Sequence, residues 1–492
     1  MGKNRTVSFF VLLIAAVSVL VVTACSSSDS TSSPSSMVVL NPTVTGPIAA
    51  PDRPVPGSTT GAATRNYNFL ASQFDLAARG YIEEEYFISG TASRFNTFPS
   101  VGETGTVLDS ENPYKTRIVV RRPISSAKFS GTAVVEWYNV TNNMDMEYCW
   151  YLMYDYIMRA GHVWVGVSAQ RVGVNALKAW SAGTTADRYA TLDVSHLKDG
   201  TALTADAFQY DIFSQAVQAI RRPVGINPLG SLTPTTIIAI GQSQSASQLA
   251  NYVNYVNPLA KVVDAFALES SLGNVIRTDL SVPVWKILAE TDVISMNEAN
   301  RRRPDDNKFV TWEVAGTSHN DARAYVSRVF LQHRDMKGVA VEDSLACAFF
   351  PGSEIPLYYA LTAGLDQLIA WARGGAPIVS APPIDVVQFT PTVVVNRDLY
   401  GNAMGGIRLP QQQVPTGENS GVNWGNGACA RWGYSEPFGA YTLDNIYTTH
   451  ASYVSLVTTA ANLALKSKYI LPEDATQAIA DATSALIPPN GH

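Results

Sequence analysis

The sequence carries no excess of basic residues. Its 35 lysines and arginines are outnumbered by 41 aspartates and glutamates, which gives a formal net charge of −6 at pH 7. Proteins that bind nucleic acid through its phosphates present a strongly basic surface. Nucleic acid is therefore not expected among the partners of this chain.

The sequence also lacks the common patterns of metal and nucleotide sites. No Cys/His spacing typical of a zinc site and no glycine-rich loop that could cradle a phosphate is present. We therefore expect no metal ion and no organic cofactor. No internal repeat is evident, and 46% hydrophobic with 15% charged residues is the composition of an ordinary globular protein.

The N-terminus has no apolar run long enough to cross a membrane. Phe9–Val22 follows Lys3 and Arg5 but spans about 14 residues, whereas a transmembrane helix needs about 20. The run ends in VTAC, which resembles a bacterial lipoprotein signal. We predict a signal peptide over residues 1–24 and lipidation of Cys25, so that the protein is exported and held at the cell envelope, on its periplasmic or outer face, by lipid.

A tether and a long folded region follow Cys25. Residues 25–65 are rich in serine and then in proline, which predicts a flexible or extended tether. Eight strands are expected after it, at residues 82–95, 114–121, 131–138, 161–169, 236–240, 265–269, 282–289 and 309–315. Most of these apolar segments alternate with helical periodicity, which predicts a mostly parallel sheet with helices on both faces.

The stretch Thr235–Asn254 carries the most chemical information. Thr236–Ile240 is a β-branched apolar run typical of a buried strand, and Ala246, Leu249 and Val253 lie on one face of a following helix. Gly241-Gln242-Ser243-Gln244-Ser245 lies between them. A serine on a tight strand-to-helix turn is the nucleophile elbow of the α/β-hydrolase fold, which is the fold class that the strand order predicts.

A serine nucleophile needs a base and an acid that orients the base. In α/β-hydrolases both follow the serine, the acid first and the histidine second. His319 comes directly after the eighth predicted strand, where a loop could direct its imidazole to Ser243. The loop after the seventh strand offers Asp292, which we prefer because it lies further into the turn, and Glu290 as the alternative; Glu269 is a third option.

The transition state of acyl transfer also needs two N–H donors for its oxyanion. One is expected from the backbone of Gln244, the residue after the nucleophile. The second is expected from the loop after the third strand, around Asn139 and Val140. The sequence has no His-Gly-Gly run that would identify this donor more closely.

Two segments are additional to what an α/β-hydrolase core requires. We place the core, with the first of them inserted in it, at residues 66–377. The first, at about residues 174–204, is a possible cap over the substrate pocket. The second, residues 378–492, is predicted to be an irregular extension packed on the core, closing with a helix around 451–466.

With these residues in place, the chain resembles bacterial extracytoplasmic alpha/beta hydrolase domain proteins. The resemblance rests on EEEYFISGTA, VEWYNVT, VGVSAQRVGV, YDIFSQA, GQSQSA, AETDV, AGTSH and GNAMGGIRLP, which are spread over most of the chain. It implies an α/β-hydrolase fold that includes the extension, and a serine hydrolase with Ser243, Asp292 and His319 as its triad.

Together these observations predict a lipid-anchored serine hydrolase that cleaves an ester or related acyl bond of a small molecule or polymer. The alternative is a catalytically inactive, surface-anchored binding protein on a hydrolase scaffold, because fold alone does not establish activity.

Export would place the remaining cysteines in an oxidising compartment, where disulfides persist. Cys149 lies in the apolar stretch MEYCWYLM and is expected to be a buried, free thiol. Cys347 precedes the last predicted core helix, and Cys429 lies in the extension. We predict a Cys347–Cys429 disulfide that links the extension to the core.

Overall fold

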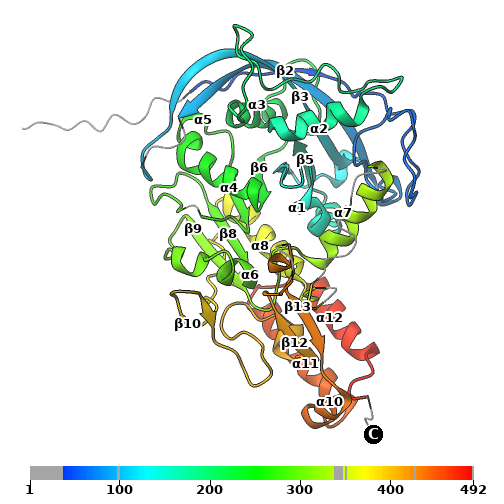
Figure 1. Ribbon diagram of the computed structural model, residues 1–492, viewed down its shortest axis with the longest axis vertical. Coiled ribbons are helices and arrows are strands. Elements are labelled where there is room, and N and C mark those ends of the chain that lie inside the picture. Colours follow the sequence, from blue (N-terminus) through cyan, green and yellow to red (C-terminus); the bar gives the residue numbers. More distant parts are fainter. Residues whose placement is uncertain are drawn as a thin grey trace, which may run out of the picture. The chain divides into compact units, whose positions relative to one another are not determined.

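The computed structural model describes residues 37–96, 100–273, 275–336, 347–349, 352–425 and 428–489. Cys25, the signal peptide and the first part of the tether lie outside these residues. The central element is a nine-stranded sheet in the order β1-β2-β3-β5-β4-β6-β7-β8-β9 (Figure 1). Its strands are β1 (Thr43–Thr45), β2 (Tyr81–Asn96), β3 (Thr106–Pro123), β4 (Thr132–Trp137), β5 (Val163–Val167), β6 (Thr236–Gln242), β7 (Ala265–Glu269), β8 (Val284–Ala289) and β9 (Phe309–Val314).

Strands β4 to β9 are parallel, and β1, β2 and β3 form an antiparallel edge that joins them through β5. Every residue of β4, β6, β7 and β8 is buried. Strands covered on both faces have no polar alternation, which is why these strands appear in the sequence as continuous apolar runs. The predicted α/β-hydrolase order is confirmed.

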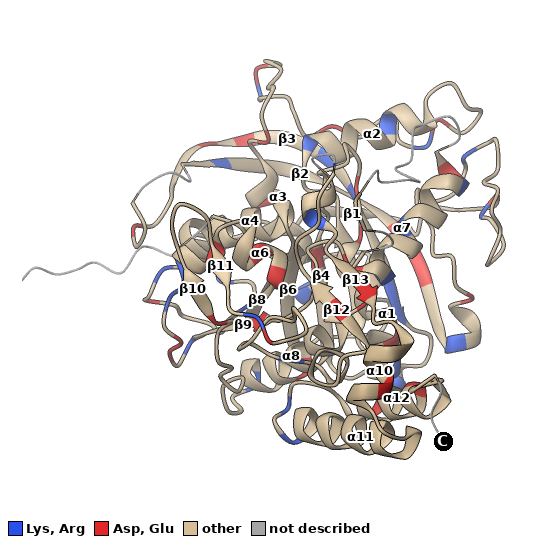
Figure 2. Cartoon of the chain, turned by 60° about the horizontal axis from the view of Figure 1, so that its bottom comes forward, with Lys and Arg blue, Asp and Glu red and all other residues tan. Residues whose placement is uncertain are grey.

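Helices pack against this sheet and continue into the C-terminal region. They are α1 (Tyr148–Arg159), α2 (Arg171–Ser181), α3 (Gln209–Arg221), α4 (Gln244–Asn251), α5 (Asn257–Ala260), α6 (Glu290–Ile294), α7 (Ala322–Asp335), α8 (Leu357–Ala372), α9 (Pro410–Gln413), α10 (Ala440–Ile446), α11 (His450–Lys466) and α12 (Pro472–Ser484). None of the helices in the described ranges is long and apolar enough to cross a membrane. Basic and acidic residues are interspersed along the described elements (Figure 2).

The sheet has one more strand than the sequence predicts, because part of the predicted tether belongs to it. Thr43–Thr45 pairs with Ser89, Ile88 and Phe87 of β2, and Val39 and Val44 are buried. The proline-rich composition suggested an extended linker. The strand within this linker has three residues, which is too few to show the alternation of polar and apolar residues typical of a strand. The strand is held by hydrogen bonds to the free edge of β2.

The segment predicted as a cap, residues 174–204, packs on the antiparallel edge of the sheet. Arg188 donates 2.7 Å from its Nε to Glu85 of β2, and the Tyr189 hydroxyl donates to the same carboxylate at 2.7 Å. Lys115 of β3 and Asp193 form an isolated antiparallel bridge. The sequence shows an insertion, but these long-range contacts decide which face it covers.

The C-terminal extension is hydrogen-bonded to the sheet. Ile407 forms a parallel bridge with Val314 at the end of β9, and its N–H donates to the Glu313 carbonyl at 2.7 Å. The extension also holds two small sheets, β10 (Val386–Gln388) with β11 (Val394–Val395), and β12 (Gly417–Ser420) with β13 (Tyr434–Pro437). It is therefore less irregular than predicted.

The extension closes with two helices where the sequence analysis expected one. Helix α11 matches the predicted range, and α12 packs against it in the lower part of Figure 1. Pro472 at the start of α12 and the acidic side chains of Glu473 and Asp474 in its first turn are typical start signals of a helix. The sequence therefore contained the information for this helix.

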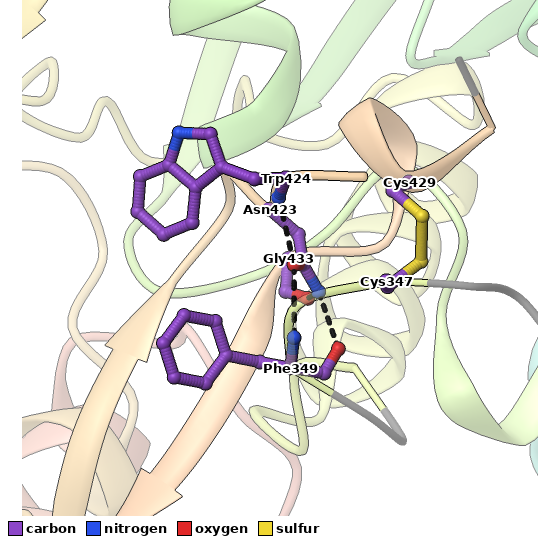
Figure 3. Close-up of a disulfide and its surroundings, with 6 residues drawn as sticks. All are labelled: Cys347, Phe349, Asn423, Trp424, Cys429 and Gly433. Carbon is purple, nitrogen blue, oxygen red and sulfur yellow. Dashed lines mark hydrogen bonds between the residues drawn. A yellow bond between two sulfur atoms is a disulfide. The ribbon is translucent and has the colours of Figure 1, made fainter. Parts of the chain in front are cut away.

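Cys347 and Cys429, which the sequence analysis pairs, form a disulfide with a Cα–Cα distance of 5.4 Å (Figure 3). A second connection lies beside it. The Asn423 side chain accepts from the Phe349 N–H at 3.3 Å and donates to the Phe349 carbonyl at 2.6 Å. Its amide also donates to the carbonyl of Gly433. Cys149 is a free, buried thiol.

We expect that replacing Cys347 and Cys429 together with serine lowers the free energy of unfolding by about 2–5 kcal/mol, because the disulfide closes a loop with a sequence separation of 82 residues. Denaturant unfolding of the double variant and of the oxidised protein measures the difference. The Cys149→Ser variant is the matched control for thiol removal without loss of a cross-link. Equal stability of the double variant and the oxidised protein would contradict the expected effect.

Candidate active site

Ser243 occupies the turn between β6 and α4 in a rare backbone conformation. Its φ is 56° and its ψ is −116°, a region that residues with a side chain seldom adopt. The turn is tight enough to require glycine two residues earlier, because a Cβ on Gly241 would lie 2.9 Å from the carbonyl carbon of Ser245. This strained turn is the elbow geometry expected from the sequence, and it projects Ser243 from the end of the strand.

Ser245 stands where glycine is common in such motifs, and its hydroxyl completes the turn. The Gln242 N–H donates to Ser245 Oγ at 3.0 Å, and Ser245 Oγ–H donates to the Gln242 carbonyl at 2.9 Å. Ser245 is fully buried. The hydroxyl thus satisfies two backbone groups next to Ser243, which a glycine would leave to other partners.

His319 and Asp292 lie in line with Ser243. The distance from Ser243 Oγ to His319 Nε2 is 2.8 Å, and the distance from His319 Nδ1 to Asp292 Oδ1 is 2.6 Å. The other carboxylate oxygen of Asp292 accepts from Ser270 Oγ at 2.6 Å and from the Ala289 N–H at 2.8 Å. These bonds orient the buried carboxylate toward the imidazole, and the three side chains have the arrangement of a serine, a base and an orienting acid.

Glu290, the alternative acid, is directed elsewhere. Its carboxylate accepts from the Gly316 N–H at 2.6 Å, from the Gly421 N–H at 3.1 Å and from Arg397 at 2.7 Å. It therefore joins the loop before His319 to the extension. Glu269, the third option, is fully buried beside the Cys149 thiol, with its Oε2 3.7 Å from Sγ.

The two backbone N–H groups predicted as oxyanion donors in the loop after β4 have different hydrogen-bond acceptors in the structure. The Asn139 N–H donates to the Met146 carbonyl at 3.1 Å, so the expectation that it faces the oxyanion is wrong. The Val140 N–H instead donates to the Gln244 side-chain oxygen at 3.2 Å. Gln244 is the first residue of α4, so its own N–H has no acceptor within the helix. Val140 and Gln244 are the remaining pair of candidates.

A small, polar pocket opens at Ser243. Its volume is about 60 Å³, well below the roughly 300–1,000 Å³ of common ligand pockets. None of residues 174–204 lines it, and the cap stays a prediction. The pocket is lined by Asn139, Thr141, Asn142, Tyr148, Gln242, Ser243, His319, Asn320, Arg328 and Arg431.

The sequence analysis did not identify Arg328 or Arg431. Arg328 lies on α7, nine residues after His319 along the chain, and Arg431 lies in the extension. Neither position belongs to a recognisable motif. The nearest signal was the predicted disulfide, because Cys429 is two residues from Arg431 and brings that segment to the core.

Burial changes the pKa of several acids near the site. Burial raises the pKa of Glu136 to about 8, and it raises the pKa of Glu269 and of Asp321 above their usual range. Among the described residues, no group of three or more His, Cys, Asp or Glu side chains is placed to hold a metal ion. The arrangement can carry out nucleophilic acyl transfer with amino-acid side chains.

Comparison with known proteins places this chain in a family. The family model described as "Alpha/beta hydrolase domain" matches residues 44–480. The chain therefore belongs to the alpha/beta hydrolase domain family and is a hydrolase of this fold. The match includes the extension up to α12, so the extension is part of the family's domain.

No curated protein matches the chain. Among solved structures, it is similar to an α/β serine hydrolase without a lid from Xanthomonas campestris, with 15% identity over 50% of this chain and 93% of that chain and a TM-score of 0.27. A CE15 glucuronoyl esterase from Teredinibacter turnerae has 9% identity over 51% of this chain and 73% of that chain, with a TM-score of 0.26.

Proposed function

We propose that this hydrolase is a serine hydrolase that cleaves a carboxylic ester or a related acyl bond through Ser243, His319 and Asp292. The observation that carries the proposal is the continuous line from Ser243 Oγ through both imidazole nitrogens to Asp292 Oδ1, with separations of 2.8 and 2.6 Å. The strained backbone of Ser243 at the end of β6 supports the same role.

In this mechanism, His319 Nε2 accepts the Ser243 proton as Oγ attacks the substrate carbonyl carbon. The tetrahedral oxyanion is bound by the N–H groups of Gln244 and Val140. The Val140 N–H currently donates to the Gln244 side chain, so the substrate oxygen replaces that side-chain oxygen. Imidazolium then protonates the departing alcohol, and the acyl-enzyme remains.

Water completes the reaction when His319 removes its proton and the hydroxide oxygen attacks the acyl-enzyme. The C–Oγ bond breaks, Ser243 regains its proton from His319, and the acid is released. Asp292 keeps the imidazole in the required tautomer and stabilises its cationic form.

Labelling with a fluorophosphonate probe, combined with a panel of short-chain and long-chain acyl esters, tests the proposal. We expect covalent modification at Ser243 and ester turnover that is blocked by the probe. A purified, folded protein that neither reacts with the probe nor hydrolyses any acyl substrate would instead favour the inactive binding protein.

We further propose that Cys25 is the lipidated N-terminus of the mature protein, on the basis of the VTAC sequence after the apolar run. Intact-mass and N-terminal peptide analysis of protein from the native envelope should identify a diacyl or triacyl cysteine, and Cys25→Ser should release the protein from the membrane fraction. Two or more acyl chains are needed for firm anchoring. An unmodified N-terminus downstream of Cys25 would contradict the lipid anchor.

A further inference from the structure

Arg328 is a buried cation that faces the Ser243 pocket. The residue is only 3% exposed, and its Nε has no hydrogen-bond partner in the described chain. Its guanidinium lies 5.5 Å from the centre of the Tyr325 ring, and no ion pair joins it to a carboxylate of the described residues, unlike Arg323 and Arg334 on the same helix. Burying a guanidinium without a counter-charge is unfavourable, so this position suits a charge that the ligand provides.

Arg431 brings a second arginine to the lining of the same pocket from a different part of the chain. Its backbone is held in place: the Asn320 N–H donates to the Arg431 carbonyl at 2.9 Å, directly beside His319, and the Cys347–Cys429 disulfide lies two residues away. The extension thus contributes an arginine whose backbone is held beside His319 by covalent and hydrogen-bonded links.

No described acidic residue lines the pocket to balance these two cations. Glu136 and Glu269 are buried, and burial raises the pKa of both carboxyl groups. Asp292 is directed at His319 and is committed to the imidazole. Among the described residues that line it, the pocket therefore combines Ser243 with two arginines and no carboxylate.

We propose that Arg328 and Arg431 bind a carboxylate of the substrate, so that the enzyme hydrolyses half-esters of short dicarboxylic acids. Planar guanidinium groups match the two oxygens of a carboxylate, and the small volume of about 60 Å³ favours a short acyl chain between the carboxylate and the carbonyl that Ser243 attacks. The ester C–O bond breaks, the alcohol leaves with a proton from His319, and water releases the dicarboxylate. The inference rests on the serine-hydrolase function proposed above.

The test compares two esters of nearly equal shape, monomethyl succinate and methyl 4-oxopentanoate, by titrating the released acid at constant pH. We expect kcat/KM for the charged ester to exceed that for the neutral ester by roughly tenfold or more. Arg328→Gln should lower this ratio by a similar factor, and Arg328→Lys should retain part of it because the charge remains. The exposed Arg159, which pairs with Glu473 at 2.9 Å, supplies the matched control Arg159→Gln, whose ratio should equal that of the wild type.

Binding gives a readout that does not need turnover. Calorimetry of Ser243→Ala with succinate, with inorganic phosphate and with neutral butyramide should show binding of succinate alone, weakened roughly tenfold or more by Arg431→Gln. Arg431 is only partly buried, so this variant remains informative if Arg328→Gln does not fold.

The outcomes separate the two proposals. A ratio near one in the wild type, an unchanged ratio in both arginine variants, or tighter binding of phosphate than of succinate would overturn the carboxylate subsite while leaving the serine hydrolase intact. Succinate binding that depends on Arg431, in a protein that hydrolyses neither ester and does not react with fluorophosphonate, would support the subsite and overturn the hydrolase mechanism.

Discussion

Replacing Ser243 with alanine is expected to lower kcat by roughly 10⁴- to 10⁶-fold, because removal of the nucleophile leaves only the contribution of binding and the oxyanion donors. The change deletes one oxygen and the only bond between the turn and His319 Nε2. Steady-state hydrolysis of the best ester from the substrate panel measures the loss, with circular dichroism as the check on folding.

Ser245→Ala is the matched control within the same five residues. Its hydroxyl bonds only to the backbone of Gln242, so we expect a smaller effect, less than about tenfold in kcat, together with a loss of stability. Fluorophosphonate labelling should persist in Ser245→Ala and disappear in Ser243→Ala. Labelling that survives in Ser243→Ala, or that disappears in Ser245→Ala alone, would assign the nucleophile to the other serine.

Asp292→Asn is expected to lower kcat by about 10⁴-fold through the tautomer of His319. Ser270 Oγ and the Ala289 N–H both donate to Oδ2 of Asp292, so the oxygen of an asparagine must occupy that position. The amide nitrogen then faces Nδ1 of His319 and donates to it. A neutral imidazole that accepts at Nδ1 carries its proton on Nε2, and Nε2 can no longer accept the proton of Ser243.

Glu290→Gln distinguishes this electrostatic effect from a general disturbance of the loops. Glu290 accepts hydrogen bonds from Gly316 and Gly421 but is not bonded to His319. We expect a lower free energy of unfolding and a change in kcat of less than about tenfold. If Glu290→Gln proved as inactive as Asp292→Asn, with both proteins folded, Asp292 could not be the sole acid that orients His319.

The proximity of Ser243, Asp292 and His319 could be predicted because local patterns and the strand order place them at the same sheet edge. A β-branched run, a turn of small residues and a helical stripe define the elbow at Ser243 within twenty residues of sequence. The strand order then restricts the acid to the loop after β8 and the base to the loop after β9. Asp292 was preferred over Glu290 because it lies further into the turn after the strand, and the hydrogen bonds of Glu290 to Gly316 and Gly421 give the physical reason for its different direction.

Other features depend on contacts between distant segments. Asn139 and Val140 are adjacent in sequence, yet only the Asn139 N–H donates a hydrogen bond to the Met146 carbonyl. The strand Thr43–Thr45 exists because β2 offers a free edge, and residues 174–204 cover β2 and β3 because Glu85 binds Arg188 and Tyr189. No period or spacing in the sequence specifies these partners.

By itself, the sequence predicted the α/β-hydrolase fold, the strained turn at Ser243, the places of Asp292 and His319 after the two following strands, and the pairing of Cys347 with Cys429. Hydrophobic periodicity and turn chemistry act over a few residues, so they can be recognised in the sequence. Only the tertiary structure decided that Arg328 from α7 and Arg431 from the extension meet at Ser243. About a hundred residues of chain separate these two arginines, and their convergence depends on packing, on the disulfide and on the bond from Asn320 to Arg431 rather than on any local preference.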